Sequence, residues 1–286
     1  MRSLIFEISQ SINTIYSGWI LWNLFLAFVP MLLSFRLFRR KAVFSLWFVP
    51  ACVVTAAIGA FGLHSRIPRI FGSLSLTWQN IQAGDRGTVL QLVWLGIVVA
   101  IALGVSLWLF RRSYASKIWL WWGSLAVFIA FLPNAPYVLT DIIHLIRGTS
   151  FGVTSIWMIA LVLIPLHLCA ILLGFEAYVL SLLNINYFLK DKDLTHLILP
   201  AELALHALSA FGIYLGRFIR LNSWDILVDP TSIIAITLNT LTSRRPVAVI
   251  GLTFVILTVF YWLMKQVTLG LKLRIRYARS GIDILT

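Results

Sequence analysis

The feature that most constrains this fold is a series of long apolar stretches, at least six of them, each bounded by charged residues. A helix that crosses a hydrocarbon core about 30 Å thick needs about 20 apolar residues at 1.5 Å each. Of the 286 residues, 60% are apolar and 12% are charged, against about 45–50% and about 25% in a soluble domain. The composition excludes a water-soluble globular domain and predicts an all-α, polytopic transmembrane helical bundle.

The boundaries of the apolar stretches predict about seven membrane spans, of which the fourth is broken. We expect these spans near residues 18–38, 42–63, 89–110, 117–135, 153–175, 197–219 and 247–268. They divide the chain into an N-terminal membrane region (1–116, about three spans), a core membrane domain (117–270) and a basic cytoplasmic tail (271–286).

The segment between the second and third predicted spans contains residues that interrupt helices. Pro68, Gly72, Trp78, Asp85 and Gly87 all lie between residues 64 and 88. We therefore expect a loop that carries a short interfacial helix rather than one continuous helix.

The chain has a net charge of +13, and the distribution of its basic residues among the loops sets the expected orientation in the membrane. The 23 Lys and Arg residues stand in short runs beside apolar stretches, which is typical of topology determinants and not of a nucleic-acid-binding surface. With seven spans, the excess of Lys and Arg lies on the side of the C-terminus. This predicts a cytoplasmic C-terminus and an outside N-terminus, with the lipid bilayer as partner and no nucleic acid.

The fourth span ends in the segment FLPNAPYVLTDIIHLIR, residues 131–147. Pro133 and Pro136 predict a break, because each removes a backbone donor and clashes with the preceding turn. We expect Asn134 to cap a new helical segment that carries Pro136 in its first turn.

In that new segment Tyr137, Asp141 and His144 recur at i, i+4 and i+7, so they share one helix face. A helix broken at membrane depth exposes a positive N-terminal dipole end, which many transporters use to hold anionic groups. The alternative is a helix that stops at the surface, with Asp141 and His144 solvated or paired.

The sixth span, within residues 196–225, carries a polar stripe on an otherwise apolar helix. Glu202, His206, Ser209, Arg217 and Arg220 fall within an arc of about 80°. An ionisable group near the bilayer centre costs about 2.5–3.5 kcal/mol or more, so Glu202 and His206 are expected to face the bundle interior and pair there. Alternatively these two groups serve packing, and the arginines extend to the surface.

Because spans alternate in direction, the segment of Asp141 and His144 and the segment 217–225 emerge on the same side of the membrane. Two arginines suit a carboxylate or a phosphate, since each guanidinium offers a planar fork of donors. Alternatively Asp141 and Asp225 hold Arg217 and Arg220 in structural ion pairs. The candidate ligand-binding residues are Asn134, Tyr137, Asp141, His144, Arg217, Arg220, Asn222, Ser223, Trp224 and Asp225.

Motifs of known enzyme classes are absent: the chain has no HExxH, GxSxG, phosphate-binding glycine loop or CxxC. Asp141, His144 and His206 are the residue types of a zinc site, but nothing in their spacing requires one, so we predict no metal and assign no cofactor. His167, in the fifth span, is expected to be a buried, satisfied histidine. A contact from His167 to Glu202 or His206 is the alternative.

Two motifs, FLPNAPYVLTDIIHL and YLGRFIRLNSWDIL, resemble the hallmark of a bacterial integral-membrane family catalogued as domain of unknown function 1361. The resemblance covers roughly residues 117–270 and implies a multi-pass protein of the bacterial cytoplasmic (inner) membrane. The resemblance implies no particular activity. The positions that match the family pattern are Asn134, Pro136, Tyr137, Asp141, His144, Gly216, Arg217, Arg220, Asn222, Ser223, Trp224 and Asp225.

These observations lead to three hypotheses about function. In the first, the site at the non-cytoplasmic mouth binds or transports an anionic small molecule or a lipid headgroup. In the second, the protein is a membrane-embedded hydrolase or transferase that acts on a lipid-linked substrate, with Asp141 and His144 as candidate catalytic residues. In the third, it is an assembly factor of a membrane complex, and the motifs lock the bundle. The sequence assigns no oligomeric state.

Overall fold

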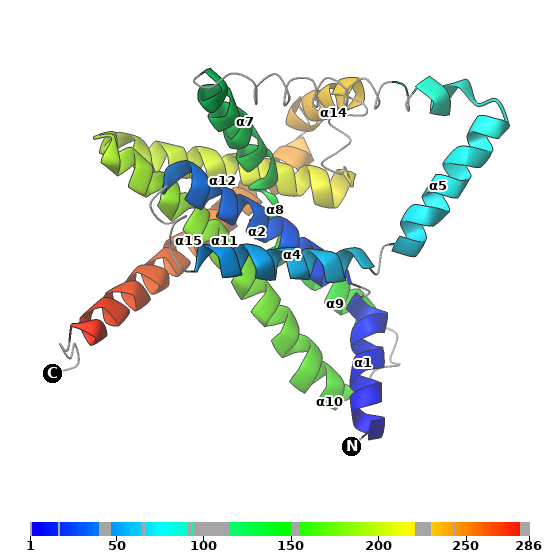
Figure 1. The fold of residues 1–286 in the computed structure, drawn as a ribbon, viewed down its shortest axis with the longest axis horizontal. Helices are drawn as coiled ribbons and strands as arrows, with labels where there is room; N and C mark the ends of the chain where they lie inside the picture. Colours follow the sequence, from blue (N-terminus) through cyan, green and yellow to red (C-terminus); the bar gives the residue numbers. More distant parts are fainter. Residues whose placement is uncertain are drawn as a thin grey trace.

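The computed structural model describes residues 2–16, 18–39, 47–64, 67–90, 93, 115–149, 155–220, 230–242 and 244–280. Every regular element among these residues is helical (Figure 1), which confirms the all-α class. Five helical segments are long and apolar enough to cross a membrane: Trp19–Phe38, Trp119–Thr149, Ile156–Asp191, Thr195–Ile219 and Arg244–Arg279.

Two of the seven predicted spans are not among these five segments. The predicted span at 42–63 corresponds to α4 (Phe48–His64), an apolar helix of 17 residues that packs against α2 (Trp19–Phe38). The predicted span at 89–110 lies almost entirely outside the described residues. In the part of the chain that the structure describes, the protein is therefore helical and has five candidate membrane spans.

The predicted break in the fourth span is confirmed. Helix α7 (Ala115–Phe131) ends before Pro133, and the chain continues as α8 (Asn134–Tyr137), the 3₁₀ turn η1 (Val138–Asp141) and α9 (Ile142–Thr149). Pro136 has no N–H to donate to the Leu132 carbonyl, and the N–H of Ala135 donates to it instead at 3.1 Å.

The expected role of Asn134 as a helix cap is wrong. Pro133 occupies the cap position of α8, and Asn134 is the first residue of the helix. The Asn134 Nδ2 donates to the carbonyl of Phe131 at 3.1 Å. This side chain therefore satisfies a carbonyl that the break frees at the end of α7, and not an N–H of the new helix.

Two glycines let neighbouring helices approach the break closely. A Cβ added at Gly174, in α11 (Ile164–Asp191), would lie 2.9 Å from Cγ2 of Val138. A Cβ added at Gly212, in α12 (Ile198–Tyr214), would lie 2.7 Å from Cβ of Pro133. The break is thus held between α11 and α12.

The helices that flank the break contain two short π-helical segments. Helix α11 follows α10 (Ile156–Met158) and the π-segment η2 (Ile159–Leu163) and runs to Asp191, well beyond the predicted end of the fifth span. Helix α12 follows the 3₁₀ turn η3 (Thr195–Leu197) and continues into the π-segment η4 (Leu215–Ile219).

Residues 64–88 differ from the sequence prediction. Helix α5 (Ile67–Gln82) is continuous over 16 residues and passes through Gly72 and Trp78. Pro68 lies in its first turn, where a missing N–H costs nothing. The helix ends before Gly84, whose φ of 78° lies in the left-handed region.

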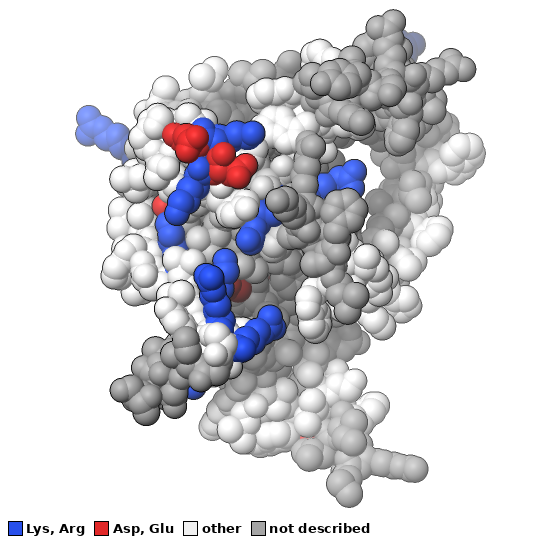
Figure 2. Space-filling model, turned by 60° about the vertical axis from the view of Figure 1, so that its left-hand side comes forward, with Lys and Arg blue, Asp and Glu red and all other residues white. Residues whose placement is uncertain are grey.

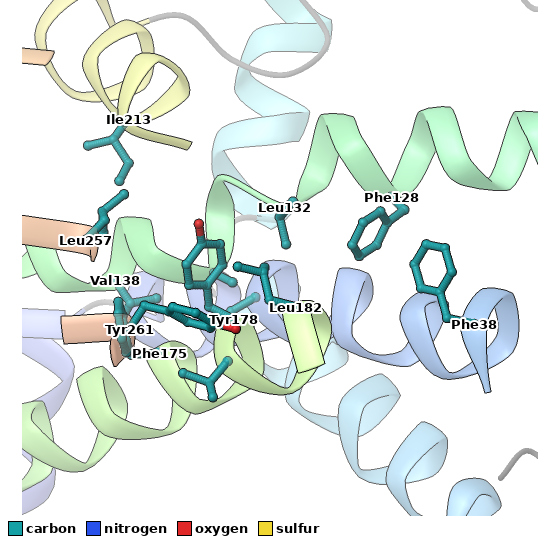
Figure 3. Packing of buried hydrophobic residues seen from close by; sticks show 14 of the residues in the cluster. Phe38, Phe128, Leu132, Val138, Phe175, Tyr178, Leu182, Ile213, Leu257 and Tyr261 are labelled. Carbon is teal, nitrogen blue, oxygen red and sulfur yellow. The ribbon is translucent and has the colours of Figure 1, made fainter. Parts of the chain in front are cut away.

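The hydrophobic core lies where α2, α7, α11, α12 and α15 (Arg244–Arg279) meet. Figure 3 shows Tyr178 and Leu182 of α11 beside Leu132 at the break. Phe128 of α7 meets Phe38 of α2 edge to face, with 5.5 Å between the ring centroids. Other described helices are α1 (Arg2–Tyr16) and α14 (Pro230–Thr242).

Basic side chains gather at one end of the bundle. In Figure 1 the C-terminal ends of α11 and α15 lie on the left, and α9 lies on the right. Figure 2 shows the left-hand side of the molecule, where Lys and Arg side chains outnumber the acidic ones. Exposed basic residues at the C-terminal ends of α2, α11 and α15 include Arg36, Lys190, Lys272, Arg274, Arg276 and Arg279.

Candidate functional site

Arg217 is the centre of a polar cluster between η4 and the broken fourth helix. Its Nε and Nη2 donate to Oγ1 of Thr140 at 3.0 and 2.8 Å. Nη2 also donates to Oδ1 of Asp141 at 2.5 Å, and Nη1 donates to Nε2 of His144 at 3.1 Å. The guanidinium carbon lies 4.4 Å from the centroid of the Tyr137 ring. We call these five residues, together with Asn23, the Arg217 cluster.

The carboxylate of Asp141 is fully buried, with 0% relative exposure, and both of its oxygens have partners. Oδ1 accepts from Arg217, and Oδ2 accepts from Nδ2 of Asn23 in α2 at 2.7 Å. Of the two alternatives for Arg217, the structural ion pair with Asp141 is therefore formed. Asp225, the suggested partner of Arg220, lies outside the described residues.

The contact with Arg217 fixes the protonation state of His144. A guanidinium only donates, so Nε2 of His144 accepts and the proton of the neutral ring is on Nδ1. On its other side the ring of His144 lies 4.5 Å from that of Trp19, between centroids. The lone pair that a general base would use is directed at the arginine.

The predicted face of Tyr137, Asp141 and His144 is confirmed as a geometric unit, because all three side chains reach the same guanidinium. Four of the five guanidinium N–H groups have acceptors within the Arg217 cluster. One N–H of Nη1 has no acceptor among the described residues. Arg217 is thus held by several contacts within the Arg217 cluster.

Two further arginines stand close to this cluster in the sequence. Arg147 lies one helical turn after His144 in α9, and Arg220 follows η4 directly. Both side chains are exposed, and neither forms an ion pair with any residue that the structure describes. The candidate residues Asn222, Ser223 and Trp224 also lie outside the described residues.

Arg220 has an uncommon backbone conformation, with φ 65° and ψ 33°. A side chain in this left-handed region costs about 1–2 kcal/mol, and glycine is the residue that avoids the cost. The chain therefore places a large cation where the backbone favours glycine.

Of the polar stripe in the sixth span, Glu202 and His206 are buried as predicted, and Ser209 is buried with them. Oε1 of Glu202 accepts from Nζ of Lys265 at 2.6 Å, from the Tyr261 hydroxyl at 2.5 Å and from Nδ2 of Asn186 at 2.5 Å. Glu202 and His206 do pair in the interior, but with other residues, since Nδ1 of His206 is 2.7 Å from the Tyr178 hydroxyl.

His167 is buried as expected, with 1% relative exposure, but the expectation that its ring is satisfied is wrong. Neither ring nitrogen has a hydrogen-bond partner among the described residues. The ring stacks on Tyr16, with 6.0 Å between centroids, and meets Trp19 edge-on at 6.1 Å. The alternative contact with Glu202 or His206 is also not formed.

Several residues of these clusters were missed by the sequence analysis. Asn23 is a lone amide within the apolar helix Trp19–Phe38, and Thr140 precedes Asp141 in the chain. Lys265 falls within the predicted span at 247–268 and was not singled out, although it binds Glu202 inside the bundle. A lone polar residue in an apolar span was the available signal for Asn23.

Metal coordination has no support from this geometry. No group of three or more His, Cys, Asp and Glu side chains that could hold a metal ion occurs in the described part of the chain. Asp141 and His144, two of the three suggested ligands, are both bonded to Arg217.

Comparison with known protein families gives a match. The model of the family "Protein of unknown function (DUF1361)" matches residues 94–259, more than half of the chain. The match begins earlier than the expected residue 117, within the predicted span at 89–110, and it contains the whole Arg217 cluster except Asn23. No curated protein and no solved structure matches this chain.

Proposed function

Since this chain belongs to the family of unknown function DUF1361, whose description fixes no activity, we propose a function from the geometry of the Arg217 cluster. The protein is a multi-pass membrane protein, of about seven spans, that binds an anionic group at the non-cytoplasmic mouth formed by α9 and the end of η4. The anion is carried by a small molecule or a lipid headgroup, which the protein binds or transports.

One observation carries this proposal: among the residues that the structure describes, the charges at the mouth do not balance. Arg147 and Arg220 lie close in the chain to residues of the Arg217 cluster, whose carboxylate, Asp141, already has both oxygens bound by Arg217 and Asn23. Arg147 and Arg220 therefore remain as cations without a described counter-ion. A phosphate or carboxylate group supplies the missing charge and the acceptors that guanidinium groups require.

The backbone at Arg220 supports the same assignment. Strained residues persist where the surrounding structure holds them, and they concentrate at functional sites. An arginine in the left-handed region lowers the stability of the fold. We attribute its presence there to a role of its charge in binding.

The geometry favours binding over the hydrolase or transferase hypothesis. A general base must have a free lone pair within reach of the substrate proton, whereas Nε2 of His144 accepts from Arg217. Asp141 is likewise occupied by Arg217 and Asn23. In our proposal these residues position Arg217, and the exposed arginines contact the ligand.

The orientation follows from the distribution of charge. Helix α2 begins at the Arg217 cluster, where Trp19 contacts His144, and ends at the basic side chain of Arg36. Because cytoplasmic ends of membrane proteins carry the excess of Lys and Arg, we place the basic end shown in Figure 2 in the cytoplasm. The Arg217 cluster then faces the outside of a bacterial cytoplasmic membrane.

The test is the binding of butyl phosphate to the full chain in nanodiscs of phosphatidylcholine. We expect the double variant Arg147→Ala/Arg220→Ala to weaken binding at least ten-fold, because hydrogen bonds between charged groups contribute about 1.5–3 kcal/mol. The melting temperature should not change, since both side chains are exposed and unpaired among described residues.

The matched control is Arg86→Ala, which removes an exposed arginine beyond the end of α5. It should bind butyl phosphate as the wild type does. Equal weakening in the control, or unchanged binding in the double variant, contradicts the proposal. If the double variant instead loses stability together with binding, the assembly and locking hypothesis is favoured.

A further inference from the structure

An apolar cavity of about 280 Å³ lies on the side of α9 next to the Arg217 cluster. It is formed by α9, η2 and the first turn of α11, and seven of the eight residues around it are aliphatic side chains or Thr149. Its lining is Ile142, Leu145, Ile146, Thr149, Ile159, Ile164, His167 and Leu168. An apolar cavity of about 150 Å³ already accommodates a small hydrocarbon, so this one has room for part of an alkyl chain.

The rim of the cavity faces the surroundings of the helices. Ile142, Ile146, Ile164 and Leu168 are 46%, 58%, 40% and 51% exposed. They belong to two of the candidate membrane spans, Trp119–Thr149 and Ile156–Asp191. In a bilayer, the acyl chains of lipids contact such a rim.

His167 distinguishes this cavity from an ordinary packing defect. It is the one titratable residue of the lining, it is more than nine-tenths buried, and its nitrogens have no partner among the described residues. An unpaired polar group in such a place costs about 1–3 kcal/mol. An oxygen near the head of a bound lipid would satisfy it.

The cavity and the Arg217 cluster are close neighbours along α9. Ile142 and Leu145 line the cavity, and the adjacent residues Asp141 and His144 bind Arg217. Trp19 lies against both His144 and His167, at 4.5 and 6.1 Å between ring centroids. A ligand with its charge at the arginines thus has the cavity within reach of its chain.

The π-segment η2 adds a feature that is common near binding sites. It supplies Ile159 to the lining, and its last residue, Leu163, accepts a hydrogen bond from the Tyr16 hydroxyl at 2.9 Å. Single π-turns in helices occur frequently at functional sites. The second one, η4, carries Arg217.

We propose that the anionic ligand of this protein is a lipid of the bilayer, whose headgroup binds at Arg147 and Arg220 while its alkyl chain occupies the cavity beside His167. This inference rests on the proposed function and narrows it, because a soluble anion has no chain to place there. The headgroup chemistry is a phosphate or carboxylate, and the ligand enters from the membrane and not from water.

The experiment compares dodecyl phosphate with butyl phosphate, again with the full chain in phosphatidylcholine nanodiscs. Leu168→Trp fills the cavity from its exposed rim. We expect it to weaken binding of dodecyl phosphate at least five-fold and to leave binding of butyl phosphate within two-fold. Partition of the probe into the bilayer is the same for all variants and cancels in this comparison.

The control is Leu173→Trp, on the same helix and 53% exposed, at a position that does not line the cavity. It should leave both dissociation constants unchanged. His167→Phe tests the polar end of the cavity: it should weaken dodecyl phosphate at least three-fold without lowering the melting temperature, because it removes an unpaired imidazole.

The outcomes separate the two proposals. If Leu168→Trp leaves the dissociation constant of dodecyl phosphate unchanged while Arg147→Ala/Arg220→Ala still weakens butyl phosphate, the lipid inference is overturned and the anion site survives. If the wild type binds neither phosphate, the anion site is overturned, and the lipid inference falls with it.

Discussion

Arg217 illustrates how a cation is kept inside a membrane protein. Its side chain is 13% exposed, and its charge is balanced by the fully buried Asp141. Thr140 and His144 take most of the remaining donors. The pair therefore stabilises the fold mainly by avoiding an isolated buried charge, which is the situation in which loss of one partner is most costly.

We expect Arg217→Ala to lower the free energy of unfolding by about 3–5 kcal/mol, because Asp141 would keep only Asn23 as partner. The double variant Arg217→Ala/Asp141→Ala should be more stable than Arg217→Ala alone, since it leaves no unpaired charge. Unfolding of the detergent-solubilised protein measures both. A double variant no more stable than the single one would show that the pair is not coupled.

Residue periodicity predicted part of this cluster and missed the rest for a physical reason. Tyr137, Asp141 and His144 share a face because helical spacing requires it. Asn23 comes from a helix 118 residues away in the chain, and nothing in local spacing reports such a contact. The unpaired state of His167 was likewise not predictable, because it depends on which neighbours the fold places around the ring.

At the scale of elements, the sequence predicted positions of helices better than their ends. The broken fourth helix follows directly from two prolines that remove backbone donors. Helix α11 continues to Asp191 because its later turns, although more polar, still bury residues such as Tyr178 and Leu182. Helix α5 was misjudged because Pro68 lies in a first turn, where it is tolerated.

Because α12 approaches the break closely, we expect a single methyl group added at Gly212 to destabilise the fold. Gly212→Ala would place its Cβ 2.7 Å from Cβ of Pro133, so the helices must separate. We expect a loss of about 1–3 kcal/mol in unfolding free energy. The control is Gly123→Ala in α7, where no described residue outside the helix's own backbone has an atom within 4 Å of the added Cβ.

Gly123→Ala should stabilise the protein by up to about 1 kcal/mol, because alanine is the better helix former. Melting temperatures of the two variants should therefore move in opposite directions. A Gly212→Ala variant as stable as the wild type would mean that α12 moves away from Pro133 without cost.

At the scale of the whole molecule, the bundle contains two separate polar regions. The Arg217 cluster occupies the end where α2 begins, and Glu202 with Lys265 ties α12 to α15 inside the bundle. The described basic residues beyond Lys265, from Lys272 to Arg279, follow it along α15 and are all exposed. The order along the molecule is thus the Arg217 cluster, the buried ion pair of Glu202 with Lys265, and the basic end.

This order makes the orientation testable with thiol labelling. After Cys52 and Cys169 are replaced by serine, single variants Arg220→Cys and Arg274→Cys place a thiol at the anion site and at the basic end. We expect a membrane-impermeant maleimide to label Arg220→Cys in intact cells and Arg274→Cys only after permeabilisation, because excess Lys and Arg mark the cytoplasmic side. The reverse pattern would place the proposed anion site on the cytoplasmic side of the membrane, and the proposed lipid ligand would then come from the inner leaflet.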